Sequence, residues 1–290
     1  MLTQDELKKY LHYEPSTGVF TRILSTNNNI KVGAIAGSKH KSGYVHIRVL
    51  AGMYKGHRLA WLYTHGAWPI YGVDHINGIK NDNRIANLRE ATQTQNSRNS
   101  KVAINNTTGI KGVTWNAKNK TYMTRITIEG VNKHLGSYKS LYKAYIAYDT
   151  CAKDNFGAFY RAQELTLLQD IQFFHEKFDL VYDGKPRMLP KDLADFRIKF
   201  MYEELAEYEK AVAENDIAGQ LDALVDLVYV ALGTSYMQGL PFKAAWDEVN
   251  NCNMRKVKAG TNGEGSKRGS PHDVIKPDGW QSPDYSKILS

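Results

Sequence analysis

The spacing of apolar and polar residues changes twice along the chain. Up to about residue 100, glycine-punctuated strand segments such as the alternating 44–50 (YVHIRVL) are mixed with two helical stretches, 3–11 and 57–66. From Gly109, three short strands and a tight turn at Glu129-Gly130 precede one helix. After residue 165 the apolar residues keep helical spacing throughout, which is typical of an α-helical bundle.

These changes predict a multidomain α+β protein, because 290 residues suit two or three hydrophobic cores. We expect one domain at 1–104, a βββα domain at 105–163, and an all-α domain at 164–290 that ends in an irregular tail after Gly260. The third region should contain four helices joined by short connections, including a Pro/Gly loop at 183–190.

Charge divides the chain in a similar way. Residues 1–165 hold 23 Lys and Arg against 10 Asp and Glu, whereas the rest holds 15 against 20, within a net charge of +8. A basic first half suits a polyphosphate partner such as double-stranded DNA, and the acidic second half suggests a different task.

Composition also bears on location. The two cysteines, Cys151 and Cys252, form no CxxC pair, and the N-terminal residues lack the basic and apolar regions of a signal peptide. Since no run approaches about 18 apolar residues, we expect a cytoplasmic protein with no membrane partner.

The polar block 73–99 contains VDHINGIKNDNRIANLREATQTQN, with Asp74, His75, Asn87 and Asn96. Phosphodiester hydrolysis needs a base near neutral pH, which histidine provides, and a divalent cation beside the phosphate. Carboxylate and amide oxygens are suitable ligands for Mg²⁺ or Mn²⁺. The block therefore predicts a metal-dependent nuclease site.

This block, together with GHRLAWLYTHGAWP and YEPSTGVF before it, resembles the HNH endonucleases of phage, in their homing branch, over about residues 3–100. The resemblance implies a ββα-metal fold, with a strand before Asp74, a second strand near 84–89 and a helix carrying Asn96. It implies that His75 is the general base, that Asp74 and Asn96 hold the metal, and that Asn87 hydrogen-bonds to His75 and positions it.

In the second region, Lys111, Val113 and Trp115 alternate along one strand, and Met123, Arg125 and Thr127 along the next. Ile126 and Ile128 should instead pack on the helix that carries Tyr145 and Tyr148. GIKGVTW, TRI, HLG and AYIAYD resemble the DNA-binding domain of the Apetala-two/ethylene-response-factor family, which implies binding through the sheet. The candidate DNA contacts, chosen by face and charge, are Lys111, Trp115, Arg125 and Lys133.

In the third region, two i, i+4 pairs of carboxylates, Glu203 with Glu207 and Asp222 with Asp226, lie on two successive helices, and Glu204 flanks the first pair. Such a cluster repels itself unless a cation binds. EELAEYEKA, DALVDLVYVALGTSYMQGL and WDEVNNCNMRKV resemble the MazG-like nucleoside-triphosphate pyrophosphohydrolases and their phosphoribosyl-ATP relatives.

That resemblance implies a Mg²⁺ site at these carboxylates, hydrolysis between the α and β phosphates of a nucleotide, and a nucleotide contact at Asn253 and Lys256. It departs at Ala223, where the family has Glu and this chain has Asp222 one residue earlier. Leu224, Leu227, Val228 and Val230 serve either a homo-oligomer interface or the core.

Three hypotheses follow. The first is a DNA endonuclease with an added DNA-binding domain and a second, pyrophosphohydrolase activity. The second is a nucleotide pyrophosphohydrolase whose N-terminal half only binds DNA. The third is a DNA-binding protein with neither activity. Magnesium-dependent plasmid nicking and pyrophosphate release discriminate among them.

Overall fold

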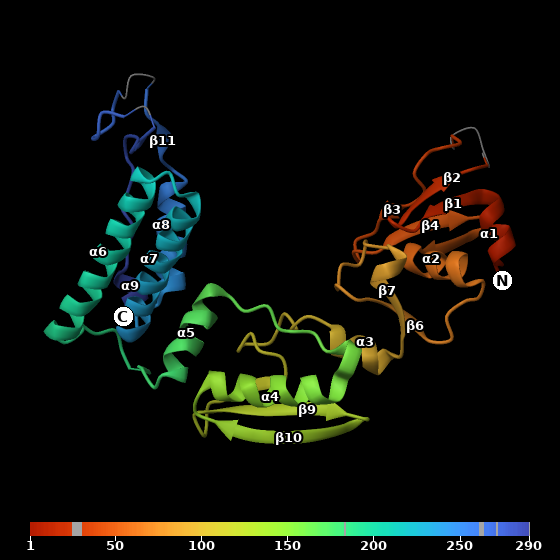
Figure 1. Ribbon diagram of the computed structural model, residues 1–290, viewed down its shortest axis with the longest axis horizontal. Helices are drawn as coiled ribbons and strands as arrows, with labels where there is room; N and C mark the ends of the chain where they lie inside the picture. Colours follow the sequence, from red (N-terminus) through yellow and green to blue (C-terminus); the bar gives the residue numbers. More distant parts are fainter. Residues whose placement is uncertain (25–30, 183, 261–263, 271, 290) are drawn as a thin grey trace. The chain divides into compact units, whose positions relative to one another are not determined.

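The computed structural model describes residues 1–24, 31–182, 184–260, 264–270 and 272–289, and the chain forms two compact units, Met1–Glu164 and Leu165–Ser290 (Figure 1). Part of the predicted loop at 183–190 and of the predicted tail lies outside the described residues.

The first unit starts with a series of short elements. In chain order they are α1 (Gln4–Tyr10), β1 (Leu11–Glu14), β2 (Val19–Arg22), β3 (Ser38–Lys39), β4 (Val45–Val49), β5 (Gly52–Lys55), α2 (Gly56–His65), β6 (Gly72–His75), the 3₁₀ turn η1 (Ile85–Asn87), β7 (Leu88–Ala91) and α3 (Gln93–Asn99). The strands pair antiparallel as β1–β2, β3–β4–β5 and β6–β7. The strand predicted near 84–89 thus begins later, at Leu88, because residues 85–87 form the 3₁₀ turn.

The two helices expected in this part are confirmed. Thr3 and Glu6 form a reciprocal capping box at the start of α1, and Gly66 ends α2 in the left-handed conformation at φ 79°. Behind β6 lies one apolar core from α1, β1, β2, β4 and α2, with Leu7, Leu11, Tyr13, Phe20, Ile47, Leu59 and Leu62 almost fully buried. Burial of each such side chain stabilises the folded state by about 1.5–3 kcal/mol. This core therefore holds β6 in a fixed position.

The rest of this unit is β8 (Val113–Asn116), β9 (Thr121–Ile128), β10 (Val131–Tyr138), α4 (Leu141–Phe156) and the 3₁₀ turn η2 (Gly157–Phe159), with α4 lying over a β10–β9–β8 sheet (Figure 1). Ile126, Ile128 and Tyr148 meet in its core, which confirms the predicted packing. Gly112 is required at φ 73° because a Cβ atom there would collide with the ring of Tyr148.

The second unit consists mainly of helices. They are α5 (Leu167–Lys177), α6 (Lys191–Ala213), α7 (Ile217–Met237) and α8 (Phe242–Asn253), followed by β11 (Val257–Lys258), β12 (Val274–Ile275) and the short helix α9 (Ser286–Leu289). Residues 214–216 join α6 to α7, and the two helices lie side by side (Figure 1). The Arg197 guanidinium on α6 links them by donating to Thr234 Oγ1 at 2.9 Å and to the Val230 carbonyl at 2.7 Å.

Some of the described residues after α8 form regular contacts, although an irregular tail is predicted from Gly260 onward. Val257 pairs with Ile275 and Lys258 with Val274, and the Trp280 indole donates to the Cys252 carbonyl at 2.8 Å. The indole N–H thus joins Trp280 to the end of α8, a contact that the Gly and Ser content did not reveal.

Helix α7 is long and apolar enough to cross a membrane by length and composition, a criterion that core helices also meet, and 22% of its apolar window is buried. Val230 is buried, whereas Leu224 and Val228 are 45% and 50% exposed. These residues were predicted to serve either the core or a homo-oligomer interface. Val230 belongs to the core, whereas Leu224 and Val228 are not covered by it.

Candidate functional sites

Strands β6 and β7 bring the predicted nuclease residues together. Asp74 pairs with Arg89 and His75 with Leu88 in the antiparallel register. Both Asp74 and His75 are buried at the end of β6, and α3 packs behind them. The sequence folds this way because Val73 and Leu88 join the apolar core and leave the polar side chains at the strand end.

The Asp74 carboxylate is held by two residues that the sequence reasoning missed. Arg89 donates to Oδ2 through Nε at 2.9 Å and Nη2 at 2.8 Å. Asn99 Nδ2 lies 3.0 Å from Oδ2 and 3.2 Å from Oδ1, and it also donates to the His75 carbonyl at 2.8 Å. Oδ1 keeps lone pairs for a further partner, while the paired Arg89 compensates the buried charge.

The His75 ring is oriented by Asn83, whose Oδ1 atom lies 3.3 Å from Nε2. Because a carboxamide oxygen only accepts, this contact favours the tautomer with its proton on Nε2 and leaves Nδ1 able to accept one. Burial lowers the pKa of His75 below 6.5, against an opposite effect of the Asn83 hydrogen bond. The ring is therefore neutral near pH 7, as a general base requires.

Asn87 does not make the predicted hydrogen bond to His75. Its Nδ2 donates to Asn77 Oδ1 at 3.0 Å and to the Asp82 carbonyl at 2.9 Å, and its Oδ1 accepts from the Asn77 backbone at 3.0 Å. Asn87 thus holds the 76–87 loop in shape, and Asn83 is the partner of His75. The sequence offered no way to choose between two asparagines in the same loop.

A cavity of about 560 Å³ opens in front of this pair, lined by Asp74, His75 and Asn96 together with Lys80, Lys101 and Arg161. Asn96 is exposed on α3, while Asn99, one turn later, is the buried one. The cavity thus combines a neutral histidine, a carboxylate with a free lone pair, an exposed amide and three cations. Such a set fits an anionic substrate.

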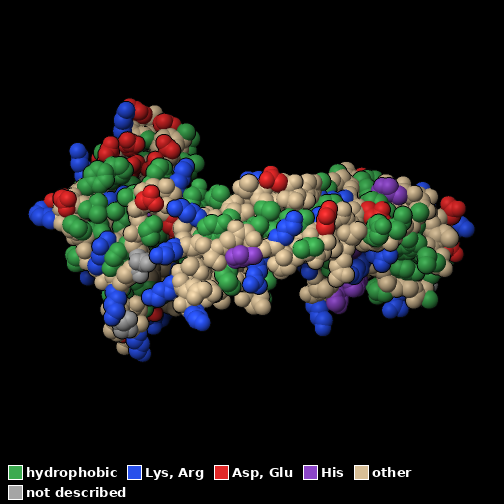
Figure 2. All heavy atoms as spheres, turned by 90° about the horizontal axis from the view of Figure 1, so that it is seen from below, with side chains coloured by type: hydrophobic (Ala, Val, Ile, Leu, Met, Phe, Trp, Pro, Cys, Tyr) green, Lys and Arg blue, Asp and Glu red, His purple; other side chains and the backbone are tan. Residues whose placement is uncertain are grey.

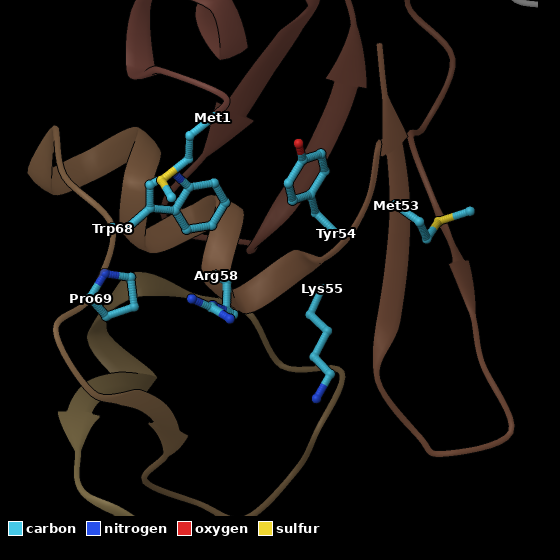
Figure 3. A pocket seen from close by; sticks show the side chains of 7 residues that line it. All are labelled: Met1, Met53, Tyr54, Lys55, Arg58, Trp68 and Pro69. Atoms are coloured by element: carbon cyan, nitrogen blue, oxygen red, sulfur yellow. The ribbon is translucent and has the colours of Figure 1, made fainter. Parts of the chain in front are cut away.

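A second cavity of about 540 Å³ lies beside β5 and α2, lined by Met1, Met53, Tyr54, Lys55, Arg58, Trp68 and Pro69 (Figure 3). The Arg58 guanidinium lies over the Trp68 ring at 5.3 Å, and the Trp68 indole donates to the Leu2 carbonyl at 2.9 Å. Neither a carboxylate nor a histidine lines this hollow. Its contacts tie the N-terminal residues to α2, which is a structural task.

The β8–β10 sheet does not present the four candidate DNA contacts on one face. Trp115 pairs with Tyr122, and Lys133 with the buried Ile126, so Trp115 and Lys133 both belong to the side that α4 covers. Arg125 pairs with His134 and lies exposed on the opposite side. Alternation within a strand was predicted, but the register between strands was not, so only Arg125 remains on the outer face.

Lys111 is also placed elsewhere. Its ammonium donates to the carbonyls of Ser97, Arg98 and Ser100 at 2.7–3.0 Å, at the end of α3. Burial, with the nearby Arg161, lowers the pKa of Lys111 to about 8. A lysine at a helix C-terminus satisfies carbonyls that have no partner within the helix. Lys111 therefore joins α3 to the sheet and is not free to contact DNA.

We expect the Lys111→Met variant to lower the free energy of unfolding of the first unit by about 1–3 kcal/mol, since it removes the charged donor from three carbonyls at the end of α3 but keeps the apolar stem. Urea unfolding of the full chain measures this. Lys118→Met, at an exposed position in the β8–β9 turn, is the matched control and should change stability by less than about 0.5 kcal/mol. Equal stability of the two variants would contradict the assignment.

In the second unit, α6 carries Glu203, Glu204 and Glu207, and α7 carries Asp222 and Asp226. Figure 2 shows acidic side chains gathered beside hydrophobic ones on the helical unit, at the left of the view. Glu204 is half-buried, and its Oε2 atom is buried without a hydrogen-bond partner. Its pKa is raised by burial and then by Asp226, Glu207, Glu203 and Asp222, in that order. The five carboxylates thus lie within electrostatic reach of one another.

These carboxylates are not arranged as a closed metal site. Among the residues that the structure describes, no three His, Cys, Asp or Glu side chains form a group able to hold a metal ion. Ala223 is 2% exposed whereas Asp222 is exposed, so Asp222 does not replace a carboxylate at the buried position.

The two predicted nucleotide contacts lie at and after the end of α8. Asn253 is exposed, and Lys256 lines a basic hollow of about 430 Å³ with Lys267, Arg268 and Lys276. Its ammonium lies 5.7 Å from the centre of the Trp280 ring. In the described part of the chain, neither residue forms a hydrogen bond or ion pair with the five carboxylates.

Comparisons with known proteins agree with two of the three regions. Residues 54–98 match the HNH endonuclease family, and residues 171–253 match the phosphoribosyl-ATP pyrophosphohydrolase family. The chain is also similar to "Protein 3.8" of Escherichia phage T7, with 35% identity over 75 residues, or 26% of this chain and 62% of the phage protein. The match therefore spans less than two thirds of that relative.

Neither family segment covers residues 105–163, so the resemblance to the Apetala-two/ethylene-response-factor domain stays a prediction. Within the two matched segments lie Asp74, His75, Asn87 and Asn96 of the first site and all five carboxylates of the second. The chain thus contains one segment similar to HNH endonucleases and a second segment similar to phosphoribosyl-ATP pyrophosphohydrolases.

Proposed function

We propose that the first unit is a metal-dependent DNA endonuclease in which His75 deprotonates the attacking water. The observation that carries this proposal is the shared cavity of Asp74, His75 and Asn96, with cations around it. Nδ1 of the neutral His75 ring is the proton acceptor, because Asn83 favours the proton on Nε2. Asn83 and Asn99 act as positioning residues. Asn83 contacts the His75 ring, and Asn99 donates to the His75 backbone carbonyl.

The donor set in this cavity fits a hard divalent cation such as Mg²⁺ or Mn²⁺. Asp74 Oδ1 has only one long contact, from Asn99 at 3.2 Å, and Asn96 is exposed to the same cavity. These two residues would hold the ion, which would supply positive charge at the phosphate and the departing oxygen. The deciding experiment is the nicking of supercoiled plasmid by the full chain with Mg²⁺ or Mn²⁺, and after chelation with EDTA.

For the second unit we propose Mg²⁺-dependent hydrolysis of a nucleoside triphosphate between its α and β phosphates. The orphaned, buried Oε2 of Glu204 among four further carboxylates supports it, since a cation would relieve both the unmet hydrogen bond and the repulsion. Glu203, Glu204, Glu207 and Asp226 would be the ligands, with Asp222 beside them and the substrate phosphates completing the set. Asn253 and Lys256 would contact the nucleotide.

The exposed apolar residues of α6 and α7 support a homo-oligomer. They are Phe196, Ile198, Tyr202, Leu205, Val212, Ile217, Leu221, Leu224, Val225 and Val228, each at least 42% exposed. An uncovered set of this size is typical of an interface. Both cysteines are unpaired, which suits the reducing cytoplasm where both substrates occur.

Double-stranded DNA is the partner we propose for the outer face of the β8–β10 sheet. Replacing Arg125 by alanine should weaken DNA retention. It should also reduce, by about one unit, the slope of the logarithm of the DNA association constant against the logarithm of the salt concentration, as expected for the loss of one phosphate contact. A salt series of gel-shift or anisotropy titrations, with Mg²⁺ omitted, measures both. Lys133→Ala on the α4 side is the matched control; a larger effect from Lys133 would assign binding to the other face.

The alternative, a nucleotide pyrophosphohydrolase whose N-terminal half only binds DNA, differs in one outcome. It predicts DNA retention and pyrophosphate release without any nicking. The pairing of Asp74 with Arg89 is the observation that favours it, because a carboxylate already paired competes less well for a cation.

A further inference from the structure

The segment that follows α4 lies against the nuclease site, far along the chain from the matched residues 54–98. The Arg98 guanidinium of α3 lies 4.8 Å from the centre of the Phe156 ring, and that of Arg89 lies 3.9 Å from the centre of the Phe159 ring. Arg89, the partner of Asp74, also donates to the Ala158 carbonyl. The segment is therefore held by the same residues that shape the site.

A second set of contacts fixes the end of this segment. The Lys111 backbone N–H donates to the Gln163 side chain at 2.5 Å, and the ammonium of the same lysine binds the end of α3. Residues 156–163 thus have an anchor at each end, and the side chains between them have restricted positions.

Between these anchors, Arg161 reaches the cavity that holds His75. It lines that cavity together with Asp74, His75 and Asn96. Its guanidinium lies against Gly78, where a Cβ atom would collide with Nη1. Gly78 donates to the His75 carbonyl at 2.8 Å and sits at φ 69°, so the loop after His75 and the guanidinium are packed directly together.

The hydrogen bonds of Arg161 are incomplete. Nη2 donates to Glu164 at 3.1 Å, but Nη1 is buried without a partner, although the side chain is 19% exposed. A buried donor with no acceptor is costly unless a ligand supplies one. Lys80 and Lys101 line the same cavity, and its carboxylate, Asp74, is paired with Arg89. The missing acceptor is therefore expected to be an anion.

We propose that Arg161 binds the DNA phosphate that is cleaved, so that residues outside the HNH segment complete the nuclease site. This inference rests on the proposed nuclease function. A guanidinium presents paired N–H donors that match two phosphate oxygens, and it stabilises the extra negative charge as the water attacks. The water oxygen bonds to phosphorus, its proton moves to His75, and the bond to the 3′ oxygen breaks, with solvent protonating that oxygen.

Single-turnover nicking of supercoiled plasmid by the full chain tests this proposal. We expect Arg161→Ala to slow nicking by about 10²-fold or more, as for the loss of one donor to a developing charge. Arg161→Lys should recover only part of the rate, since it keeps the charge but not the paired donors. Added guanidinium ion, at concentrations below those that unfold the protein, should partly restore Arg161→Ala and should not restore His75→Ala.

Glu164→Gln is the matched control. It removes the visible ion-pair partner of Arg161, which is 76% exposed and therefore of little energetic weight. If Arg161 acted only through this ion pair, Glu164→Gln would reproduce the loss; we expect a rate within about twofold of the unsubstituted protein. Thermal unfolding of each variant checks the fold. If Arg161→Ala is unfolded, the nicking rate of Arg161→Lys, measured with and without guanidinium, tests the proposal in its place.

The outcomes separate the two proposals. Nicking that depends on His75 but not on Arg161 would overturn this inference and leave the nuclease function standing. An equal loss in Glu164→Gln, or no rescue of a folded Arg161→Ala by guanidinium, would overturn it as well. Absence of nicking by the unsubstituted chain with Mg²⁺ and Mn²⁺ would overturn both.

Discussion

Replacing His75 with alanine is expected to lower the nicking rate by about 10²–10⁴-fold, the usual contribution of a general base. The ring is buried, neutral because burial lowers its pKa, and held by Asn83, so no neighbouring histidine has an equivalent position. His57, whose ring centre lies 4.8 Å away, has its pKa lowered to about 3 and is buried at the start of α2. The measurement is nicked circle formed from supercoiled plasmid with Mg²⁺.

The controls for this variant separate chemistry from binding and folding. DNA retention without Mg²⁺ should stay within about twofold, because phosphate contacts along the duplex dominate affinity. His65→Ala, at an exposed position where the ring stacks on Trp61 at 4.0 Å, should nick at the normal rate. A His75→Ala protein that still nicks would remove the base from the mechanism.

The order of elements could be predicted because it depends on local rules. The Thr3 capping box, the left-handed Gly66 and the alternation of Thr124, Ile126 and Ile128 each act within a few residues. The same rules predicted one helix after the three strands, carrying Tyr145 and Tyr148, and it forms from Leu141 to Phe156 after its N-cap Ser140. Such features need no knowledge of the tertiary structure.

The details of the sites could not be predicted in the same way, because they depend on which polar residue becomes buried. The 73–99 block offers six asparagines, and burial selects Asn83 and Asn99 for the contacts with His75 and Asp74. Lys111 was predicted to lie on a strand and to contact DNA from the sheet. Strand β8 begins only at Val113, however, and the Lys111 ammonium donates to carbonyls at the end of α3. A strand's face follows from its own alternation, whereas register and segment packing follow from the whole fold.

The contribution of residues 156–163 to the nuclease site illustrates this limit. Arg161 is separated from His75 by a complete sheet-and-helix region, and no spacing rule links the two. The contact exists because the rings of Phe156 and Phe159 pack against Arg98 of α3 and against Arg89, the partner of Asp74. Packing of the segment 156–163 against the residues around His75 thus places Arg161, the proposed phosphate-binding residue, in the nuclease cavity.

Replacing Glu204 with glutamine is expected to lower pyrophosphate release by about 10²-fold or more, since the proposed cation site loses the carboxylate whose Oε2 atom is buried without a partner. The pKa of Glu204 is raised first by burial and then by repulsion from Asp226, Glu207, Glu203 and Asp222. Without metal, the same change should therefore raise the thermal midpoint, because a neutral amide avoids both costs. Mg²⁺ should stabilise the unsubstituted protein and have little effect on the variant. Differential scanning fluorimetry with and without Mg²⁺ measures this, and coupled pyrophosphate detection measures the rate.

Glu209→Gln, an exposed position on the same helix, is the matched control and should behave like the unsubstituted protein in both assays. Nicking should be unchanged in both variants, because all nuclease residues belong to the other compact unit. If Mg²⁺ stabilises Glu204→Gln as much as the unsubstituted chain, the ion does not bind at these carboxylates. The Glu-rich surface of α6 would then be a solvated helix face, and the activity of the second unit would have to reside elsewhere, with the basic hollow around Lys256 as the next place to test.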